Sequence, residues 1–467
     1  MTQKVPAEVA AALGISTATF ETMQRALALQ MDAQFPEAKL LYEQALAEGG
    51  DNYNVLNMLA LVEYNLGNLD RAEALAEDAV RLAPGFAAAQ ENQRIIAAAR
   101  RVRSYRPFIF DPSVDRHPPA DGAKPLVHLY KIAGNPAGGT EWHCIDLARR
   151  LRADATVVLW TDDHSLAKVF TKDNQVHVVD PSRGALPQGG TLVVVGSYHR
   201  VQKWYATASF RRVVLLYNVV DPMGAAAILR QLCLPKRPKI ELIFASESLR
   251  RSVDLPGHFE PSPIDTDLFS PKPVVPASSG LLARVGARFR PGGVAGTKQE
   301  RFVIGRLSRD DPMKYHPGAS EFFRKLAGEG MLVRLMGGLP LASHLQDVNG
   351  IEILPQSKIP AAEFLGSLDC FTYRTDPSMT ESWGRVVAEA MATGLPVVVH
   401  ANGGYAQLIR HGENGFLFHR DDEAMQHIRD LSNSPSLRAS VGKAARETVV
   451  ALLSDTAFRQ YRDFYLR

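Results

Sequence analysis

The first hundred residues follow a helical pattern of apolar and polar positions. They are rich in Ala, Leu and Glu and carry almost no strand signal. Two stretches align at an offset of 34 residues, as from Ala38 to Ala72: PEAKLLYEQALAEGG and DRAEALAEDAVRLAP. The matched positions are Ala38, Tyr42 and Ala45 in the first and Ala72, Ala76 and Ala79 in the second. Small residues let paired helices approach closely, so each stretch is predicted to be the second helix of a hairpin.

Turn residues support the hairpin pattern. Gly67 permits a tight turn, and Pro84 stops the helix of the second copy. The pattern resembles tetratricopeptide repeats, although the first copy has Ala33 at the turn glycine and Gly50 at the proline. We predict two repeats and a closing helix around residues 86–103. An ordinary helical bundle is the alternative.

After residue 103 the pattern changes from helical to alternating. Residues 104–124 are rich in Pro, Arg and Asp and are predicted to be a linker. Short Val- and Leu-rich runs then alternate with helical stretches: KPLVHLYKI, ATVVLW, QVHVVD, TLVVVG, RRVVLLYNVV and IELIFAS. Such alternation favours a parallel sheet with helices on both faces.

A second series of strands begins near residue 301. It reads RFVIGRL, MLVRLMGG, GIEILPQ, DCFTYR, LPVVVH and GFLF. We therefore predict an α/β protein with two doubly wound, Rossmann-like domains, residues 125–275 and 301–450, facing a cleft. A linker, 276–300, joins them, and a C-terminal helix, 451–467, crosses back to the first. Ligands of such sheets bind beyond the carboxyl ends of the strands.

Composition narrows the class of protein. The chain is 46% hydrophobic and 22% charged with a net charge of +3, which does not suggest a nucleic-acid partner. Its three cysteines are far apart and form no CxxC pair, so we expect reduced thiols and no zinc site. The N-terminus does not read as a signal peptide, and no apolar run approaches the roughly 18 residues of a membrane span. We expect a cytoplasmic protein, with peripheral membrane contact left open.

Two acids stand out in the stretch MTESWGRVVAEAMATGLPVVVHANGG. Glu381 and Glu389 have seven residues between them, and residues 382–393 are predicted to be a helix that Gly394 ends. Eight helical residues rise about 12 Å, which does not favour a hydrolytic pair of carboxylates. The spacing fits better with two acids that bind different parts of an extended ligand. An anion is favoured by the free N–H groups at the helix start, at Ser382, Trp383 and Gly384.

This stretch resembles the E-x₇-E signature of retaining glycosyltransferase family 4, which has the GT-B fold. The resemblance implies that Glu381 faces the donor sugar and that Glu389 binds the ribose of the nucleotide. The block NGGYAQLIRHGENGFLF is similar to another part of that family, with Gln407 where an acid is usual. The resemblance covers roughly residues 125–467.

Cations follow the first strand of the second series, in FVIGRLSRDDPMKYHPG. Arg306 and Lys314 can neutralise a diphosphate at the carboxyl end of a buried strand. The block resembles the one that binds the donor phosphates in family 4, and it implies that both cations stabilise the leaving diphosphate. Arg309 and His316 are the alternatives to Lys314.

The opposite domain offers a glycine pair. Gly138 and Gly139 begin a predicted helix after the first strand, where a backbone without Cβ atoms can approach an anion. The pair resembles the loop that completes the phosphate site, and a plain tight turn is the alternative. Asn218 stands where family members often carry a histidine. His199 is a substitute on the acceptor side, or simply a loop residue.

The resulting hypothesis is a retaining glycosyltransferase. It moves a sugar from a nucleotide diphosphate sugar, such as a UDP-sugar, to an acceptor hydroxyl, with no cofactor and no divalent metal. The acceptor is either a surface or flagellar protein held by the repeats, or a lipid-linked saccharide with the repeats binding a protein partner. The alternatives are a GT-B-like epimerase or phosphorylase, and a repeat scaffold whose transferase half is inactive.

Overall fold

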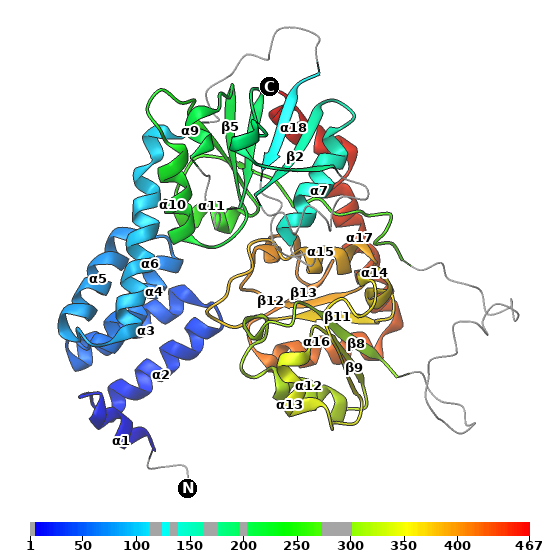
Figure 1. The fold of residues 1–467 in the computed structure, drawn as a ribbon. Coiled ribbons are helices and arrows are strands. Elements are labelled where there is room, and N and C mark those ends of the chain that lie inside the picture. The colour runs from blue at the N-terminus through cyan, green and yellow to red at the C-terminus, as the bar shows by residue number, and fades with distance from the viewer. Residues whose placement is uncertain (1–4, 112–123, 131–138, 163–174, 197–202, 272–300) are drawn as a thin grey trace, which may run out of the picture.

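The computed structural model of the chain describes residues 5–111, 124–130, 139–162, 175–196, 203–271 and 301–467. Its architecture is two α/β domains stacked on each other, with a row of helices along one side of both (Figure 1). Gly138, His199 and most of the predicted linkers lie outside the described residues.

Helical hairpins form the N-terminal region, as the pattern predicted. The helices are α1 (Val5–Ala12), α2 (Thr17–Met31), α3 (Phe35–Gly49), α4 (Tyr53–Asn65), α5 (Leu69–Leu82) and α6 (Ala87–Ser104). The matched small residues are fully buried between helices. Ala33 and Gly67, 34 residues apart, both adopt left-handed backbone, with φ of 58° and 84°. The two copies therefore share one turn geometry although only the second has the glycine.

The first α/β domain contains a seven-stranded parallel sheet in the order β3-β2-β1-β4-β5-β6-β7. Its strands are β1 (Leu126–Tyr130), β2 (Thr156–Thr161), β3 (Val176–Val178), β4 (Thr191–Val195), β5 (Arg212–Tyr217), β6 (Ile240–Phe244) and β7 (His258–Phe259). Its helices include α7 (Gly139–Leu151), α9 (Trp204–Thr207), α10 (Pro222–Leu232) and α11 (Glu247–Val253). Central strands buried along their whole length explain the near-continuous Val and Leu runs.

The second α/β domain contains a six-stranded parallel sheet in the order β10-β9-β8-β11-β12-β13. Its strands are β8 (Val303–Leu307), β9 (Leu332–Met336), β10 (Ile351–Leu354), β11 (Cys370–Tyr373), β12 (Val397–His400) and β13 (Phe416–Phe418). Its helices are α12 (Ala319–Gly328), α13 (Ala342–Leu345), α14 (Ala361–Leu365), α15 (Arg385–Ala392), α16 (Asp421–Asn433) and α17 (Pro435–Leu452).

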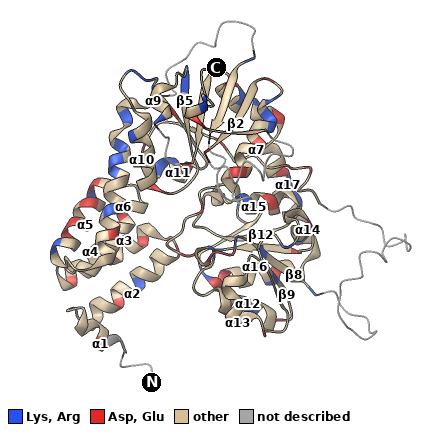
Figure 2. Ribbon diagram, in the orientation of Figure 1, with Lys and Arg blue, Asp and Glu red and all other residues tan. Residues whose placement is uncertain are grey.

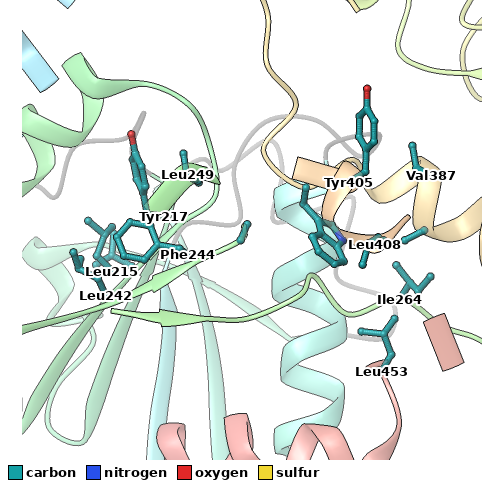
Figure 3. Packing of buried hydrophobic residues seen from close by; sticks show 14 of the residues in the cluster. Leu215, Tyr217, Leu242, Phe244, Leu249, Ile264, Val387, Tyr405, Leu408 and Leu453 are labelled. Carbon is teal, nitrogen blue, oxygen red and sulfur yellow. The ribbon is translucent and has the colours of Figure 1, made fainter. Parts of the chain in front are cut away.

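One apolar cluster runs through both α/β domains. Figure 3 shows part of it, with side chains such as Tyr217 and Phe244 on the first domain and Val387 and Tyr405 on the second. The rings of Phe259 and Trp383 meet across the interface with centroids 5.9 Å apart. Because this contact is apolar and continuous, it fixes how the two sheet edges face each other.

The C-terminal helix α18 (Asp455–Leu466) returns to the first sheet. Phe458, Phe464 and Tyr465 are buried in the same cluster as β1 and β4. The Tyr465 hydroxyl donates to Glu260 Oε2 at 2.5 Å, and Arg212 donates to the Phe464 carbonyl at 2.7 Å. The chain therefore passes from the second domain back onto the first.

The helical region contacts both α/β domains. Helix α6 packs against α10, and Arg103 pairs with Asp254 at 3.2 Å. At the other end, Asp32 after α2 accepts from Arg374 of the second domain at 3.1 Å, and its carbonyl lies 2.6 Å from Nδ1 of His419. Away from these contacts, acidic positions of α5 face basic positions of α6 (Figure 2), as in the Arg100–Asp70 pair at 3.3 Å.

Within the described residues, no helix has the length and apolar character needed to cross a membrane.

The shared turn geometry generates a stability prediction. Replacing Ala33 with glycine should raise the free energy of unfolding by about 0.5–1 kcal/mol. Left-handed backbone costs an L-residue about 1–2 kcal/mol, and glycine removes this cost. The greater conformational entropy of glycine in the unfolded chain offsets about half of the gain. Gly67→Ala should lower it by a similar amount, since a Cβ there has room but not the preferred backbone. Urea unfolding of the full chain, followed by circular dichroism, measures both. A destabilising Ala33→Gly would contradict the prediction.

Candidate active site

A cavity of about 1180 Å³ lies where the helical region and the two α/β domains meet. Its described walls include the start of α7 and the segments that follow β5, β8, β11 and β12, together with parts of α2, α4 and α6. These segments leave the carboxyl ends of parallel strands, which is where doubly wound sheets bind ligands. The volume exceeds the roughly 300–1,000 Å³ of a pocket for one small molecule.

Glu381 stands at the centre of the second domain's wall. It lies in the loop between β11 and α15, and its carbonyl accepts from Gly404 N at 2.7 Å. Lys314 Nζ and the Tyr373 hydroxyl, the latter at 2.8 Å, both donate to its Oε1. Burial raises the pKa of Glu381, but the Lys314 ammonium and these hydrogen bonds outweigh it and hold the pKa below its ordinary value. The side chain is therefore an ionised carboxylate that accepts hydrogen bonds.

The predicted helix over residues 382–393 is wrong at its start. Helix α15 begins at Arg385, because Gly384 adopts left-handed backbone with φ of 72° and turns the chain. A Cβ at Gly384 would lie 2.3 Å from the Tyr405 ring. Ser382, Trp383 and Gly384 do line the cavity, but as a loop rather than as the first turn of a helix.

Arg306 does not line the cavity, unlike Lys314. Its guanidinium lies beneath the wall between the rings of Tyr315 and Tyr373, with Cζ 4.4 and 4.2 Å from their centroids. It donates to the Arg374 carbonyl at 2.8 Å and to the Lys314 carbonyl. A side chain within β8 points into the packed layer, so Arg306 holds the lysine in place and does not reach the cavity.

Arg309 occupies the wall instead. It follows the end of β8, lines the cavity beside Lys314 and is 42% exposed in its side chain. The signal for it in the sequence was position: a residue in the loop after a strand reaches the carboxyl edge of the sheet, whereas a residue within the strand does not.

Glu389 lies behind the wall. Its Oε1 accepts from Arg385 Nε at 2.7 Å, and Arg385 also donates to Asp146 of α7 at 2.9 Å and to the Pro263 carbonyl at 2.8 Å. Burial raises the pKa of Glu389, and the Arg385 charge opposes this. Arg385 lines the cavity while Glu389 is not among its lining residues. The arginine therefore stands between Glu389 and the cavity and bridges the two domains.

The first domain supplies Gly139 and Asn218 to the opposite wall. Gly139 begins α7, and Asn218 Nδ2 donates to Thr140 Oγ1 at 3.3 Å. Asn218 Oδ1 is buried without a hydrogen-bond partner in the described structure. The structure therefore brings these two predicted residues to the cavity that holds Lys314 and Glu381.

Sequence reasoning missed His143. This buried residue of α7 lines the cavity, and its Nε2 lacks a partner among the described residues. Burial lowers the pKa of His143 to about 3, helped by the Arg385 charge, so the ring is neutral. Glu260 Oε1 lies 3.9 Å away, and burial raises the pKa of Glu260 to about 7. The sequence shows a histidine four residues after Gly139, which could have indicated a site residue. It was overlooked because it lies within an apolar helix pattern.

Among the described residues, no three His, Cys, Asp or Glu side chains gather in a way that could hold a metal ion. The three cysteines are free thiols, and two of them are buried.

Comparison with known proteins finds a family match for the second α/β domain. Residues 294–448 match the family of glycosyl transferases group 1. The match covers the loops that carry Lys314 and Glu381 and the helix α15 that carries Glu389. Two curated relatives match shorter stretches of the chain. A D-inositol 3-phosphate glycosyltransferase of Streptomyces avermitilis is 36% identical over 91 residues, which are 19% of this chain and 20% of the relative. The sulfoquinovosyl transferase SQD2 of Arabidopsis thaliana is 42% identical over 76 residues, 15% of each chain. The chain thus spans a fifth or less of the length of these two relatives.

Solved structures extend the likeness to both α/β domains. The Anabaena protein HepE in complex with UDP and glucose covers 73% of this chain, and the match spans 99% of HepE, with a TM-score of 0.55 and 16% identity. A sucrose-phosphate synthase from Thermosynechococcus elongatus covers 73% of this chain and 99% of its own, with a TM-score of 0.52 and 15% identity. The chain has the GT-B fold, preceded by a helical region.

Glu260 generates a prediction for the pH dependence of stability. Its pKa in the folded state, about 7, lies above the ordinary value of 4.5, so the folded state binds the proton more tightly. Below pH 4.5 the protonated carboxyl makes its whole contribution to the free energy of unfolding. This contribution is lost as the pH rises through 7. Glu260→Gln should therefore gain stability over the parent by up to about 1.4 kcal/mol per pH unit across this window. Thermal melting between pH 4.5 and 8 measures the difference, and a pH-independent difference would contradict it.

Proposed function

We propose that this chain is a retaining glycosyltransferase that moves a sugar from a nucleotide diphosphate sugar to an acceptor hydroxyl. One observation carries the proposal: Lys314 and Glu381 line one wall of an interdomain cavity, opposite the N-terminus of α7, and both Lys314 and the buried Tyr373 donate to the Glu381 carboxylate. The group 1 match over residues 294–448 and the UDP complex of the similar HepE structure support it.

The cations bind the diphosphate. Lys314 and Arg309 face the cavity from the second domain, and the backbone at Gly139 faces it from the first. Fixed cations and N–H groups in a site that excludes water stabilise the charge that develops on a leaving diphosphate. Arg306 contributes indirectly, because it anchors the Lys314 backbone. The proposal needs no divalent metal and no other cofactor.

Glu381 and Glu389 have different tasks. The Glu381 carboxylate, already held by Lys314 and Tyr373, accepts hydrogen bonds from the donor sugar. Glu389 binds the ribose hydroxyls once Arg385 releases or shares its carboxylate. Residues 301–450 hold the nucleotide, and residues 125–275 hold the acceptor beside Asn218.

Transfer then proceeds on one face of the sugar. The bond between the anomeric carbon and the diphosphate oxygen breaks, and the diphosphate takes the electron pair. The acceptor oxygen bonds to the same face, and its proton passes to a diphosphate oxygen. Because Glu381 is ionised, it does not act as a general acid. The acceptor is a protein in surface or flagellar glycosylation in the cytosol, held by tetratricopeptide-type repeats, or a lipid-linked saccharide.

The donor can be identified by thermal shift. Among UDP-, GDP- and ADP-sugars, one class should raise the melting temperature of the full chain, because a ligand that binds only the folded state stabilises it. CMP-sugars, which carry a single phosphate, should not. Lys314→Ala and Arg309→Ala should weaken the shift, since both remove cations from the phosphate end. Arg429→Ala, which removes an exposed arginine paired with Glu329, is the matched control. If no nucleotide sugar shifts the melting temperature, the proposal is wrong.

Because Glu381 and Glu389 are proposed to bind different parts of the donor, we expect their substitutions to change different kinetic quantities. Glu381→Gln should lower kcat by about 10²-fold or more with donor binding nearly unchanged, since its contacts act on the transferring sugar. Glu389→Gln should mainly weaken nucleotide binding. Calorimetric titration of the nucleotide and initial rates of donor turnover measure the two effects. The reverse pattern would exchange the two roles.

A further inference from the structure

The helical region lines the same cavity as the proposed reaction centre. This wall is formed by Leu27, Gln30 and Met31 of α2, Leu61, Tyr64 and Asn65 of α4, and Asn92 and Ile95 of α6. The cavity is larger than a nucleotide sugar alone requires, by comparison with pockets for single small ligands. The helices therefore border the space left for the acceptor and do not only dock a separate partner. We call these residues the helical wall.

Three amide side chains of the helical wall are held in place. Gln30 Oε1 accepts from the Tyr42 hydroxyl at 2.8 Å, Asn92 Nδ2 donates to Asn57 at 2.8 Å, and Asn65 Nδ2 donates to the Leu61 carbonyl at 2.7 Å. Each of these bonds engages one end of an amide group, and the other end remains able to bond a ligand. An amide offers both a donor and an acceptor, as does a peptide group.

Charge separates the two sides of the cavity. Glu91 is the one charged side chain among the described cavity residues of the helical region. The cations Arg309, Lys314 and Arg385 lie on the second α/β domain. A lipid-linked saccharide carries its own phosphate or diphosphate, which needs a second cationic group at the acceptor end. The described helical wall supplies none, so its chemistry does not suit that acceptor.

We propose that the helical wall binds an extended polypeptide segment whose serine or threonine hydroxyl is the acceptor. An extended chain exposes an N–H and a C=O group on every residue, at about 3.3 Å per residue. Packed helices lie about 8–10 Å apart, so amides on neighbouring helices meet the backbone about every third residue. Leu27, Leu61 and Ile95 contact its apolar side chains. Backbone recognition of this kind accepts many sequences.

The wall is fixed relative to Glu381. Asp32 follows α2 immediately after the wall residue Met31, and it is held by Arg374 at 3.1 Å and by His419 at 2.6 Å. Arg374 lies directly after β11, whose last residue, Tyr373, donates to Glu381. A peptide on the helical wall is therefore presented to the sugar-binding loop by a short chain of contacts.

The inference rests on the proposed function and is tested with the full chain. The donor selected by thermal shift, carrying a radiolabelled sugar, is incubated with a library of Ser- and Thr-containing peptides and, separately, with a prenyl-diphosphate-linked saccharide. We expect label on peptides. Asn65→Ala with Ile95→Ala should raise the peptide KM at least about tenfold, while donor affinity and nucleotide release without acceptor stay unchanged.

The matched control lies on the outer face of the helical region. Leu40→Ala with Gln44→Ala removes one exposed apolar and one amide side chain from α3, and peptide KM should not change. Melting temperatures of both double variants report on folding. If the donor is turned over but no peptide is labelled, or if Asn65→Ala with Ile95→Ala leaves the peptide KM unchanged, this inference is wrong. If no donor binds or turns over, the proposed function itself fails.

Discussion

The buried guanidinium of Arg306 is the interaction on which the candidate site depends. It lies between the rings of Tyr315 and Tyr373 and donates to the carbonyls of Lys314 and Arg374. A desolvated cation between two aromatic rings can contribute about 2 kcal/mol or more, and the two carbonyl bonds fix its orientation. Tyr373 and Lys314 are the two donors to Glu381, so one buried cation sets the positions of the groups that hold the central carboxylate.

A second constraint is the contact between the α/β domains. An apolar cluster continues from one sheet into the other, and Arg385 adds polar bonds from Glu389 to Asp146 and Pro263 across the cleft. Buried charges are tolerated only when paired, which ties the guanidinium to both carboxylates. A ligand that bonds Glu389 competes with Arg385 for it. The ribose end of the proposed donor site and the contact between domains are therefore coupled through one side chain.

The helical region adds a third side to the cleft between the two α/β domains. In a GT-B fold alone, the cavity is bordered by two sheets; here α2, α4 and α6 add a wall that is rich in amides and poor in charge. The contacts of Asp32 with Arg374 and His419 fix this wall to the domain that carries Glu381. The cavity is thus lined by parts of the chain that lie hundreds of residues apart in sequence.

The sequence by itself determined the elements, because periods of two and 3.6 residues reflect burial along each element. It predicted six of the seven strands of the first sheet, all six of the second and the helical hairpins, and missed only the two-residue β7 among the described strands. It chose Arg306 for the diphosphate and kept Arg309 only as an alternative to Lys314, because which of two nearby arginines reaches a cavity depends on where the strand ends. It placed the start of α15 too early, since the left-handed turn at Gly384 follows from the close approach of Tyr405. Only the tertiary structure brought His143 and the helical wall to the cavity, because contacts between distant segments leave no periodic mark in the chain.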